Sequence, residues 1–315
     1  MIATRDSYGN ALVEFGEEYK NLVVLDADLC EATKTCFFLE KFPDRHVECG
    51  IAEANMMGVA AGLSLTGKIP FVSTFAMFAA GRAYEQIRNS IAYPHLNVKI
   101  GATHGGISVG EDGATHQCIE DFALMRVLPG MVVLNPADDM ETRLAVKAAL
   151  DYNGPVYMRL GRPKVQELTR GADYSFQIGK GVLMRSGTDV TVVATGICVA
   201  AALEAAEQLK KQGISAEVID IHTIKPLDKE LILKSAIKTG KVITVEEHSV
   251  IGGLGSAVAE CLSDNFPVKT CRIGINDCFG ESGTAEELLE KHGLNADGIY
   301  KRVLGFMSET GGQAK

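Results

Sequence analysis

The 315-residue chain lacks several features that mark common protein classes. It has no tryptophan, and aromatic residues make up only 6% of it. No run of eighteen apolar residues occurs, and the start, MIATRDSYGN, has no apolar core of a signal peptide. Lys and Arg form no cluster and the net charge is −9, which argues against nucleic-acid or acidic-membrane partners. We therefore expect a soluble, cytoplasmic protein that binds small metabolites.

Metal and dinucleotide motifs are also missing. The eight cysteines form no CxxC pair and mostly lie in apolar segments, so we expect reduced thiols. The seven histidines show no HExxH or similar spacing, so we expect no metal held by this chain's side chains alone. The loop VEEHSVIGGLGSAVAE follows a predicted strand, but the third small residue of G-x-G-x-x-G/A is absent, which argues against a dinucleotide site.

Short β-rich runs alternate with longer helical patterns along the whole chain. This order predicts parallel βαβ units with helices on both faces of each sheet. The length suits two domains, and 46% hydrophobic residues can fill both cores. We predict an α/β fold of two three-layer α/β/α domains with mostly parallel sheets. The predicted parts are a first domain at 1–160, a linker at 161–187, a second domain at 188–310 and a frayed tail at 311–315.

The individual elements follow from the same pattern. The predicted strands are 22–27, 46–49, 70–74, 97–102, 131–134, 156–160, 189–195, 215–221, 241–247 and 268–273. The predicted helices are 6–20, 52–65, 76–92, 117–127, 138–152, 197–212, 228–239, 255–264 and 283–291. Active groups in such sheets gather at the carboxyl ends of the strands, so a site is expected in the loops that follow them.

A single carboxylate stands in an otherwise apolar helical stretch. CGIAEANMMGVAAGLSLTG, residues 49–67, contains Glu53 and no Lys or Arg. Burying an ionised carboxylate is costly unless it is paired or has a purpose. Glu53 could lie in the first turn of the helix, where free backbone N–H groups favour a negative side chain. The stretch alone leaves this interpretation and a chemical role both open.

Two further stretches carry candidate functional residues. The loop ATHGGISVGEDGATHQ after a predicted strand presents His104, Glu111, Asp112 and His116 among four glycines. Glycines let backbone approach a ligand, and imidazoles with carboxylates can bind a polyhydroxylated substrate and shuttle protons. The alternative is a solvated surface loop.

FVSTFAMF places Phe75 and Phe78 three residues apart at the end of another predicted strand. Aromatic residues at this spacing are common in helix cores. Two rings at a strand end can equally bind a flat heterocycle.

Together these stretches resemble the transketolase family of thiamine-diphosphate enzymes. GIAEANMMGVAAGLS, FVSTFAMF, GEDGATHQ and TVEEHSVIGGLGSA occur in that family's order, and the resemblance covers nearly the whole chain. It covers only the family's second half, the pyrimidine-binding and C-terminal domains, and nothing resembles the GDG…N motif for diphosphate and magnesium. The resemblance implies the C-terminal subunit of a split, two-chain transketolase. Such an enzyme transfers a two-carbon ketol unit from a ketose phosphate to an aldose phosphate in the pentose phosphate pathway.

The resemblance also implies roles toward the cofactor. The carboxyl of Glu53 would bond to N1′ of the aminopyrimidine, favouring the imino tautomer whose nitrogen removes the thiazolium C2 proton. Phe78 would stack on the aminopyrimidine with Phe75 beside it. Asp28 resembles an aspartate of the cofactor and subunit interface, and Leu29 would support the bent cofactor.

For the substrate, the resemblance assigns contacts with the sugar's phosphate, a hydroxyl and the reacting carbonyl end to His104, Asp112 and His116 respectively. Arg5 and Arg162 match arginines that hold the phosphate, which suits their fork of fixed donors. The expected catalytic residues are Glu53, His104 and His116.

Two positions depart from the family pattern and bear on acceptor preference. Ala32 stands near a usual phosphate-contacting serine, and Gly81 stands where many members have a pocket tyrosine. Thiamine diphosphate and Mg²⁺ would be anchored mainly by an N-terminal partner subunit, because the diphosphate motif is missing here. Since the family's second half also pairs with its own copy, the resemblance implies an α2β2 assembly.

Three other functions fit parts of the sequence. A 1-deoxyxylulose-5-phosphate synthase-like enzyme shares the glutamate, but usually has arginine at His104 and alanine at Glu111. The β subunit of a 2-oxo-acid dehydrogenase lacks EDGATHQ in its histidine loop. A non-catalytic assembly or regulatory subunit would have lost the chemical positions, which this chain keeps.

Overall fold

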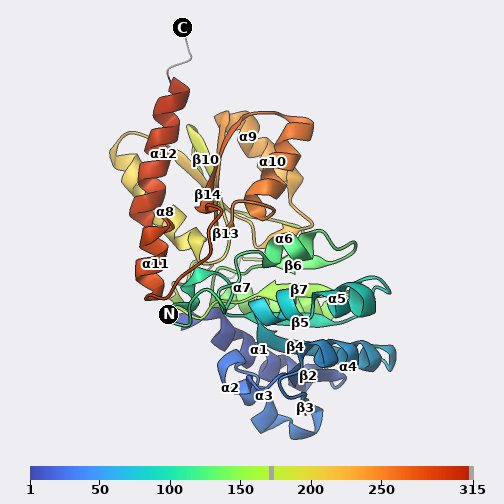
Figure 1. Ribbon diagram of the computed structural model, residues 1–315. Coiled ribbons are helices and arrows are strands. Elements are labelled where there is room, and N and C mark those ends of the chain that lie inside the picture. The colour runs from blue at the N-terminus through green and yellow to red at the C-terminus, as the bar shows by residue number, and fades with distance from the viewer. Residues whose placement is uncertain (170–173, 312–315) are drawn as a thin grey trace.

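The computed structural model describes residues 1–169 and 174–311. It confirms the predicted fold class, with two mostly parallel sheets that each lie between helices (Figure 1). The N-terminus lies near the level where the two units meet, and the last described helix, α12 (Ala296–Gly311), runs along one side of the second unit. Residues 170–173 of the predicted linker and 312–315 of the predicted tail lie outside the described residues. No helix of the described residues is long and apolar enough to cross a membrane.

The first unit is built on a seven-stranded sheet with the order β12-β6-β7-β5-β4-β2-β3, parallel except for β12. Its strands are β2 (Leu22–Asp26), β3 (His46–Glu48), β4 (Ile69–Phe75), β5 (Lys99–Thr103), β6 (Val132–Leu134), β7 (Val156–Arg159) and β12 (Thr223–Lys225). Strands β2, β4 and β5 are buried along their whole length, as expected of parallel strands covered on both faces.

Helices cover both faces of this sheet. One face carries α1 (Thr4–Glu18), α3 (Cys36–Lys41) and α7 (Asp139–Asp151). The other face carries α4 (Glu53–Leu65), η2 (Phe78–Arg82), α5 (Tyr84–Gln86), η3 (Ile87–Ala92) and α6 (Asp121–Arg126). Shorter elements are α2 (Cys30–Thr33), η1 (Pro43–Arg45) and η4 (Ile107–Val109), and β1 (Ile2–Ala3) pairs with β8 (Lys164–Val165).

The region predicted as one helix at 76–92 differs from the prediction. It consists of the short helix α5 between two π-helical turns, η2 and η3. Each π turn holds one more residue than an α-helical turn and so rotates the side chains that follow. The alanine-rich sequence supports both geometries, which is why the hydrophobic pattern did not reveal the turns.

The second unit is a five-stranded sheet with the order β14-β13-β10-β11-β9, in which only β9 is antiparallel. Its strands are β9 (Val182–Arg185), β10 (Val190–Ala194), β11 (Ala216–Asp220), β13 (Lys241–Ser249) and β14 (Lys269–Ile275). Its helices are α8 (Cys198–Lys211), α9 (Lys229–Thr239), α10 (Leu254–Asn265), α11 (Ala285–Lys291) and α12 (Ala296–Gly311). The sequence prediction omitted α12 and placed the residues of β8 and β9 in a linker.

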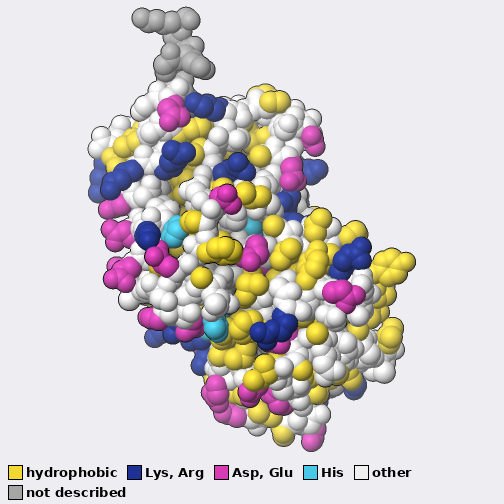
Figure 2. All heavy atoms as spheres, viewed as in Figure 1, with side chains coloured by type: hydrophobic (Ala, Val, Ile, Leu, Met, Phe, Trp, Pro, Cys, Tyr) yellow, Lys and Arg dark blue, Asp and Glu magenta, His cyan; other side chains and the backbone are white. Residues whose placement is uncertain are grey.

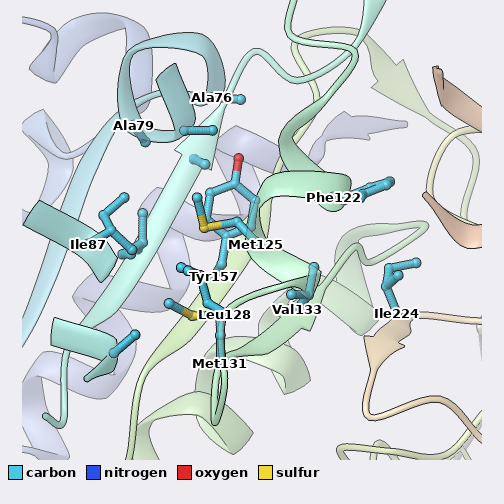
Figure 3. Close-up of a cluster of buried hydrophobic side chains, with 14 of the residues drawn as sticks. Ala76, Ala79, Ile87, Phe122, Met125, Leu128, Met131, Val133, Tyr157 and Ile224 are labelled. Atoms are coloured by element: carbon cyan, nitrogen blue, oxygen red, sulfur yellow. The ribbon is translucent and has the colours of Figure 1, made fainter. Parts of the chain in front are cut away.

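The two units share a buried hydrophobic cluster. This cluster runs from Ala76, Ile87 and Phe122 of the first unit to Ile219 and Leu254 of the second. Figure 3 shows part of it around Tyr157, with Ile224 of β12 at one side. Strand β12 follows β11 in the chain, yet it pairs with β6 of the first sheet. The exact domain boundaries that the sequence suggested stay a prediction.

Candidate active site

Four aromatic side chains meet at the carboxyl ends of β4 and β5. Phe75 is the last residue of β4, and its ring stacks on that of Phe78 with centroids 5.5 Å apart. His104 follows β5 and stacks on Phe75 at 3.9 Å. His116, from the far end of the glycine-rich loop, lies edge-on to Phe78 at 5.4 Å. The structure thus brings together residues that the sequence placed in three separate stretches.

Glu53 is the first residue of α4, so its expected position in the first helical turn is correct. Its side chain is 1% exposed, and Arg82 Nη1 donates to its Oε1 at 2.7 Å. The same guanidinium lies over the ring of Phe78, 4.7 Å from the centroid. Glu53 Oε2 is buried and has no hydrogen-bond partner among the described residues. This oxygen is free to accept a hydrogen bond from a ligand beside Phe78.

His104 is held in one orientation by both ring nitrogens. Arg5 Nη1 lies 3.0 Å from Nε2, and Thr103 Oγ1 lies 2.9 Å from Nδ1. Because arginine can only donate, Nε2 accepts and Nδ1 carries the proton. Burial, with the charges of Arg5 and Arg162 nearby, lowers the pKa of His104 to about 3. The imidazole is therefore neutral near pH 7, which suits hydrogen bonding better than proton uptake, and its expected catalytic role stays a prediction.

Arg5 and Arg162 are brought close by the start of α1 and the loop after β7. Thr4 Oγ1 accepts a hydrogen bond from the backbone N–H of Gly161 at 2.7 Å, which ties these two segments together. Arg5 also donates to the carbonyl of Ala32 at 3.2 Å, so the position that departs from the family's serine lies beside this guanidinium. Two cations at one strand-end edge can hold a dianionic group.

Asp112 lies at the exposed tip of the glycine-rich loop, near Arg162. Arg162 Nη1 donates to the Val109 carbonyl, and lies 3.2 Å from Glu111 Oε2 and 3.9 Å from Asp112 Oδ2. Glu111 therefore neutralises part of the charge that Arg162 would offer to an anion. His104 at the start of the loop is 3% exposed, whereas Glu111 and Asp112 are exposed to solvent.

Asp28 and Leu29 form a separate group after β2. The backbone N–H of Asp28 donates to Glu48 Oε1 at 2.9 Å, and that of Leu29 donates to Asp26 Oδ1 at 3.2 Å. Asp28 has a left-handed φ of 59°, so these two hydrogen bonds hold a turn that few residues adopt readily. These backbone hydrogen bonds of both residues are structural, and their cofactor roles stay predictions.

A buried ion pair supports the loop from behind. Arg159, at the end of β7, donates from Nη2 to Asp121 Oδ1 at 2.6 Å and from Nε to Oδ2 at 2.9 Å. The same guanidinium binds the carbonyls of Cys118 and Glu247. The carboxylate of Glu247 accepts from the N–H of Ser108 at 2.5 Å, which attaches the loop to the second unit. The loop conformation therefore depends on β13.

The glycine-rich turn after β13 has a structural role. Glu246 Oε2 accepts from the N–H of Leu254 at 2.6 Å and Oε1 accepts from that of Gly255 at 2.7 Å. The protein's own carboxylate thus occupies the N-terminus of α10, where a dinucleotide phosphate would bind. The sequence argument against a dinucleotide site agrees with this geometry.

Sequence reasoning missed Arg82, Thr103 and the Arg159–Asp121 pair. Arg82 lies four residues after Phe78, a spacing that places two side chains on one helix face and could have identified it. Arg159 lies at the end of a buried strand, and a buried arginine requires a partner. No sequence signal indicated which of the chain's carboxylates that partner is.

The site fits one end of a thiamine-type cofactor. The unpartnered Glu53 Oε2 can accept from a ring N–H, and Phe75 and Phe78 supply an aromatic wall. The described residues contain no group of three His, Cys, Asp or Glu side chains that could hold a metal ion.

Comparisons with known proteins agree with this geometry. The family model "Transketolase, pyrimidine binding domain" matches residues 1–167, and "Transketolase, C-terminal domain" matches residues 179–299. A protein of Methanocaldococcus jannaschii named as a transketolase C-terminal section is 52% identical, over 97% of this chain and 96% of its own length. The "6-deoxy-6-sulfo-D-fructose transketolase subunit SqwH" of a Clostridium species is 48% identical, over 94% and 92%.

A solved structure described as "Split gene transketolase, inactive beta4 tetramer" superposes with a TM-score of 0.91. It is 56% identical and covers 98% of this chain and 99% of its own. The chain therefore belongs to the transketolase family and matches the C-terminal subunit of a split transketolase.

Proposed function

We propose that this chain is the C-terminal subunit of a cytoplasmic, thiamine-diphosphate-dependent transketolase that transfers a two-carbon ketol unit from a ketose phosphate to an aldose phosphate. The observation that carries the proposal is the buried, unpartnered Oε2 of Glu53 next to the Phe75–Phe78 ring pair. A buried carboxylate oxygen without a donor is costly, and a cofactor N–H would satisfy it.

When bound, thiamine diphosphate supplies the nucleophilic carbon that accepts the two-carbon unit. Glu53 would hold the proton at N1′ of the aminopyrimidine through Oε2, and the ring of Phe78 would pack against the same heterocycle. Phe75 fixes Phe78 and His104 by stacking on both. These residues would orient the cofactor and keep water from one side of it.

The substrate would bind across the loop after β5. Arg5 and Arg162 would hold the terminal anionic group, and neutral His104 would position Arg5 for it and would contact the group itself once Arg5 turns from Nε2 to the anion. Asp112 at the loop tip would bind a sugar hydroxyl, and His116, edge-on to Phe78, would reach the reacting carbonyl end. Gly81 on η2 is exposed, and a Cβ there would collide with the side-chain methyl of Met77, so a larger side chain would require Met77 to move.

The diphosphate and Mg²⁺ would be held by an N-terminal partner subunit. This chain offers no three-ligand metal cluster in its described residues, while Mg²⁺ requires several oxygen ligands. Large apolar side chains are exposed on the first unit, with Ile51 and Leu65 each 75% and Tyr93 88% exposed. Figure 2 shows hydrophobic side chains (yellow) in several patches on the lower unit. Such surfaces mark contacts between subunits, which supports an α2β2 assembly with two copies of the partner.

The experiment combines the purified chain with its diphosphate-binding partner. Calorimetry with thiamine diphosphate and Mg²⁺ should detect tight binding to the mixture and not to this chain alone. Transfer should proceed from xylulose 5-phosphate to ribose 5-phosphate, whereas pyruvate with glyceraldehyde 3-phosphate would identify a deoxyxylulose-phosphate synthase. Tight cofactor binding and sugar transfer by the isolated chain would contradict the two-chain proposal.

The same assay separates the anionic groups that the arginines could hold. One relative carries a sulfonated ketose in its name, and two guanidinium groups can bind a sulfonate or a phosphate. Under this proposal, kcat/KM should be higher with fructose 6-phosphate as the donor than with 6-deoxy-6-sulfofructose.

A further inference from the structure

Arg82 makes two contacts at the center of the site. Its Nη1 donates to Glu53 Oε1 at 2.7 Å, and its guanidinium lies 4.7 Å from the centroid of the Phe78 ring. The side chain is 51% exposed although the carboxylate that it binds is 1% exposed. A planar, cationic group thus reaches from the surface and covers both a buried acceptor and an aromatic face.

The proposed function assigns two neighbouring contacts to the aminopyrimidine, which would pack on Phe78 and donate an N–H to Glu53 Oε2. The planar guanidinium lies over the same Phe78 ring and donates to the other oxygen of that carboxylate, Oε1. We infer that Arg82 is a placeholder for the aminopyrimidine, which covers the Phe78 ring and compensates the Glu53 carboxylate in the absence of cofactor and is displaced from that ring when the cofactor binds. The inference rests on the proposed function and adds a residue that regulates the same site.

The geometry allows such a displacement. Arg82 ends the π-helical turn η2, and half of its side chain already contacts solvent, so the guanidinium can leave without unpacking the core. Among the described residues, Glu53 is its only ion-pair partner. While Arg82 stays in place, the buried carboxylate is compensated and the chain is stable without cofactor. Once the heterocycle arrives, the ligand satisfies Glu53 and the arginine returns to water.

The test measures cofactor affinity in the assembled two-chain enzyme by calorimetry, with thiamine diphosphate and Mg²⁺ as the probe. Arg82→Ala removes the competing group, so the dissociation constant should fall about three- to thirtyfold, the range expected from one exposed ion pair and one exposed cation–π contact. Arg82→Gln, which keeps a donor but no charge, should give a smaller decrease. Arg88→Ala is the matched control, because Arg88 is exposed on the next turn and donates to Asn89 instead.

A second measurement, of thermal stability, is made first without cofactor. In the absence of cofactor, Arg82→Ala should lower the melting temperature of the isolated chain while Arg88→Ala should not, because only Arg82 compensates a buried carboxylate. Saturating cofactor should remove that difference in the assembled enzyme. Should Arg82→Ala fail to fold, Arg82→Gln still gives the direction of the change in affinity.

The outcomes separate this inference from the proposed function. If the wild-type assembly binds the cofactor and Arg82→Ala binds it equally well or more weakly, Arg82 is a permanent part of the site and the placeholder role is wrong. If the wild-type assembly does not bind thiamine diphosphate at all, both the proposed function and this inference are wrong.

Discussion

Replacing Glu53 with Gln tests the proposed chemistry with a minimal structural change. The variant keeps an oxygen that can accept the 2.7 Å hydrogen bond from Arg82. The lost charge interaction involves an arginine that is 51% exposed, and exposed pairs contribute about 1 kcal/mol at most to stability. The melting temperature of the isolated chain should therefore change little. A loss of activity would then report on chemistry and not on folding.

The catalytic effect should be much larger than the effect on stability. The amide places an NH₂ group where Oε2 is now a buried acceptor without a donor, so it cannot take up the proton at N1′. Loss of an acid–base group typically costs about 10²–10⁴ in rate, which corresponds to about 3–5 kcal/mol in the barrier. Turnover and hydrogen–deuterium exchange at C2 of the cofactor, followed by NMR in the assembled enzyme, should slow together.

The exposed carboxylate Glu85 provides the control. It lies on α5 and accepts hydrogen bonds from Gln86 and Asn89, so Glu85→Gln should exchange and turn over like the wild type. Exchange at the wild-type rate in Glu53→Gln, with cofactor bound, would refute the acid–base role. Glu53 would then be a carboxylate in a first helical turn that is compensated by Arg82 alone.

Four further substitutions test three other parts of the site. Arg162→Ala should raise the KM for phosphorylated sugars roughly ten- to 150-fold more than the KM for unphosphorylated ones. Glu111→Gln removes the carboxylate 3.2 Å from that guanidinium and should lower the KM for phosphorylated sugars. An equal rise in KM for both sugar types would show that Arg162 has a structural role. The folded pKa of His104, about 3, lies below its ordinary 6.5, so unfolded chains bind the proton first. The contribution of neutral His104 to the unfolding free energy is complete above pH 6.5 and falls by about 1.4 kcal/mol per pH unit between pH 6.5 and about 3. In His104→Gln, the unfolding free energy measured with urea should therefore fall less steeply as the pH is lowered. An unchanged pH dependence would contradict the burial argument. Asp121→Ala leaves the buried Arg159 without its carboxylate and should lower the unfolding free energy by about 3–5 kcal/mol, and a loss below about 1 kcal/mol would show that the pair is dispensable.

The fold was predictable because buried parallel strands are continuous apolar runs. LVVLD and IPFVSTF are recognisable without any partner strand, and each forms a strand within two residues of the expected bounds. Helix α12 was missed because its apolar residues are spread among glycine, tyrosine and charged residues, and its packing on α8 decides its conformation. Strand β12 has only three residues, and its pairing with β6 depends on tertiary structure.

The site was predictable to the extent that it depends on local sequence. Phe75 and His104 could be placed at strand ends because strand and loop are adjacent in the chain. The pairing of Glu53 with Arg82 could not, since it joins α4 to a π-helical turn 29 residues later whose geometry the sequence did not reveal. The tautomer of His104 likewise required knowing that Arg5 lies 99 residues away in sequence and 3.0 Å away in space.

Because β12 follows β11 in the chain but pairs with β6 of the first sheet, the chain cannot be cut cleanly between its two units. A fragment ending near residue 167 would lose β12 and expose the edge of β6, which could then pair with strands of other molecules. The complementary fragment would expose Ile219 and Leu254, whose neighbours belong to the first unit. Neither half would fold independently, so we expect the whole chain to melt in one transition. A chimaera that joins the first unit of this chain to the second unit of a relative should fold poorly, because the contacts between the units would not match.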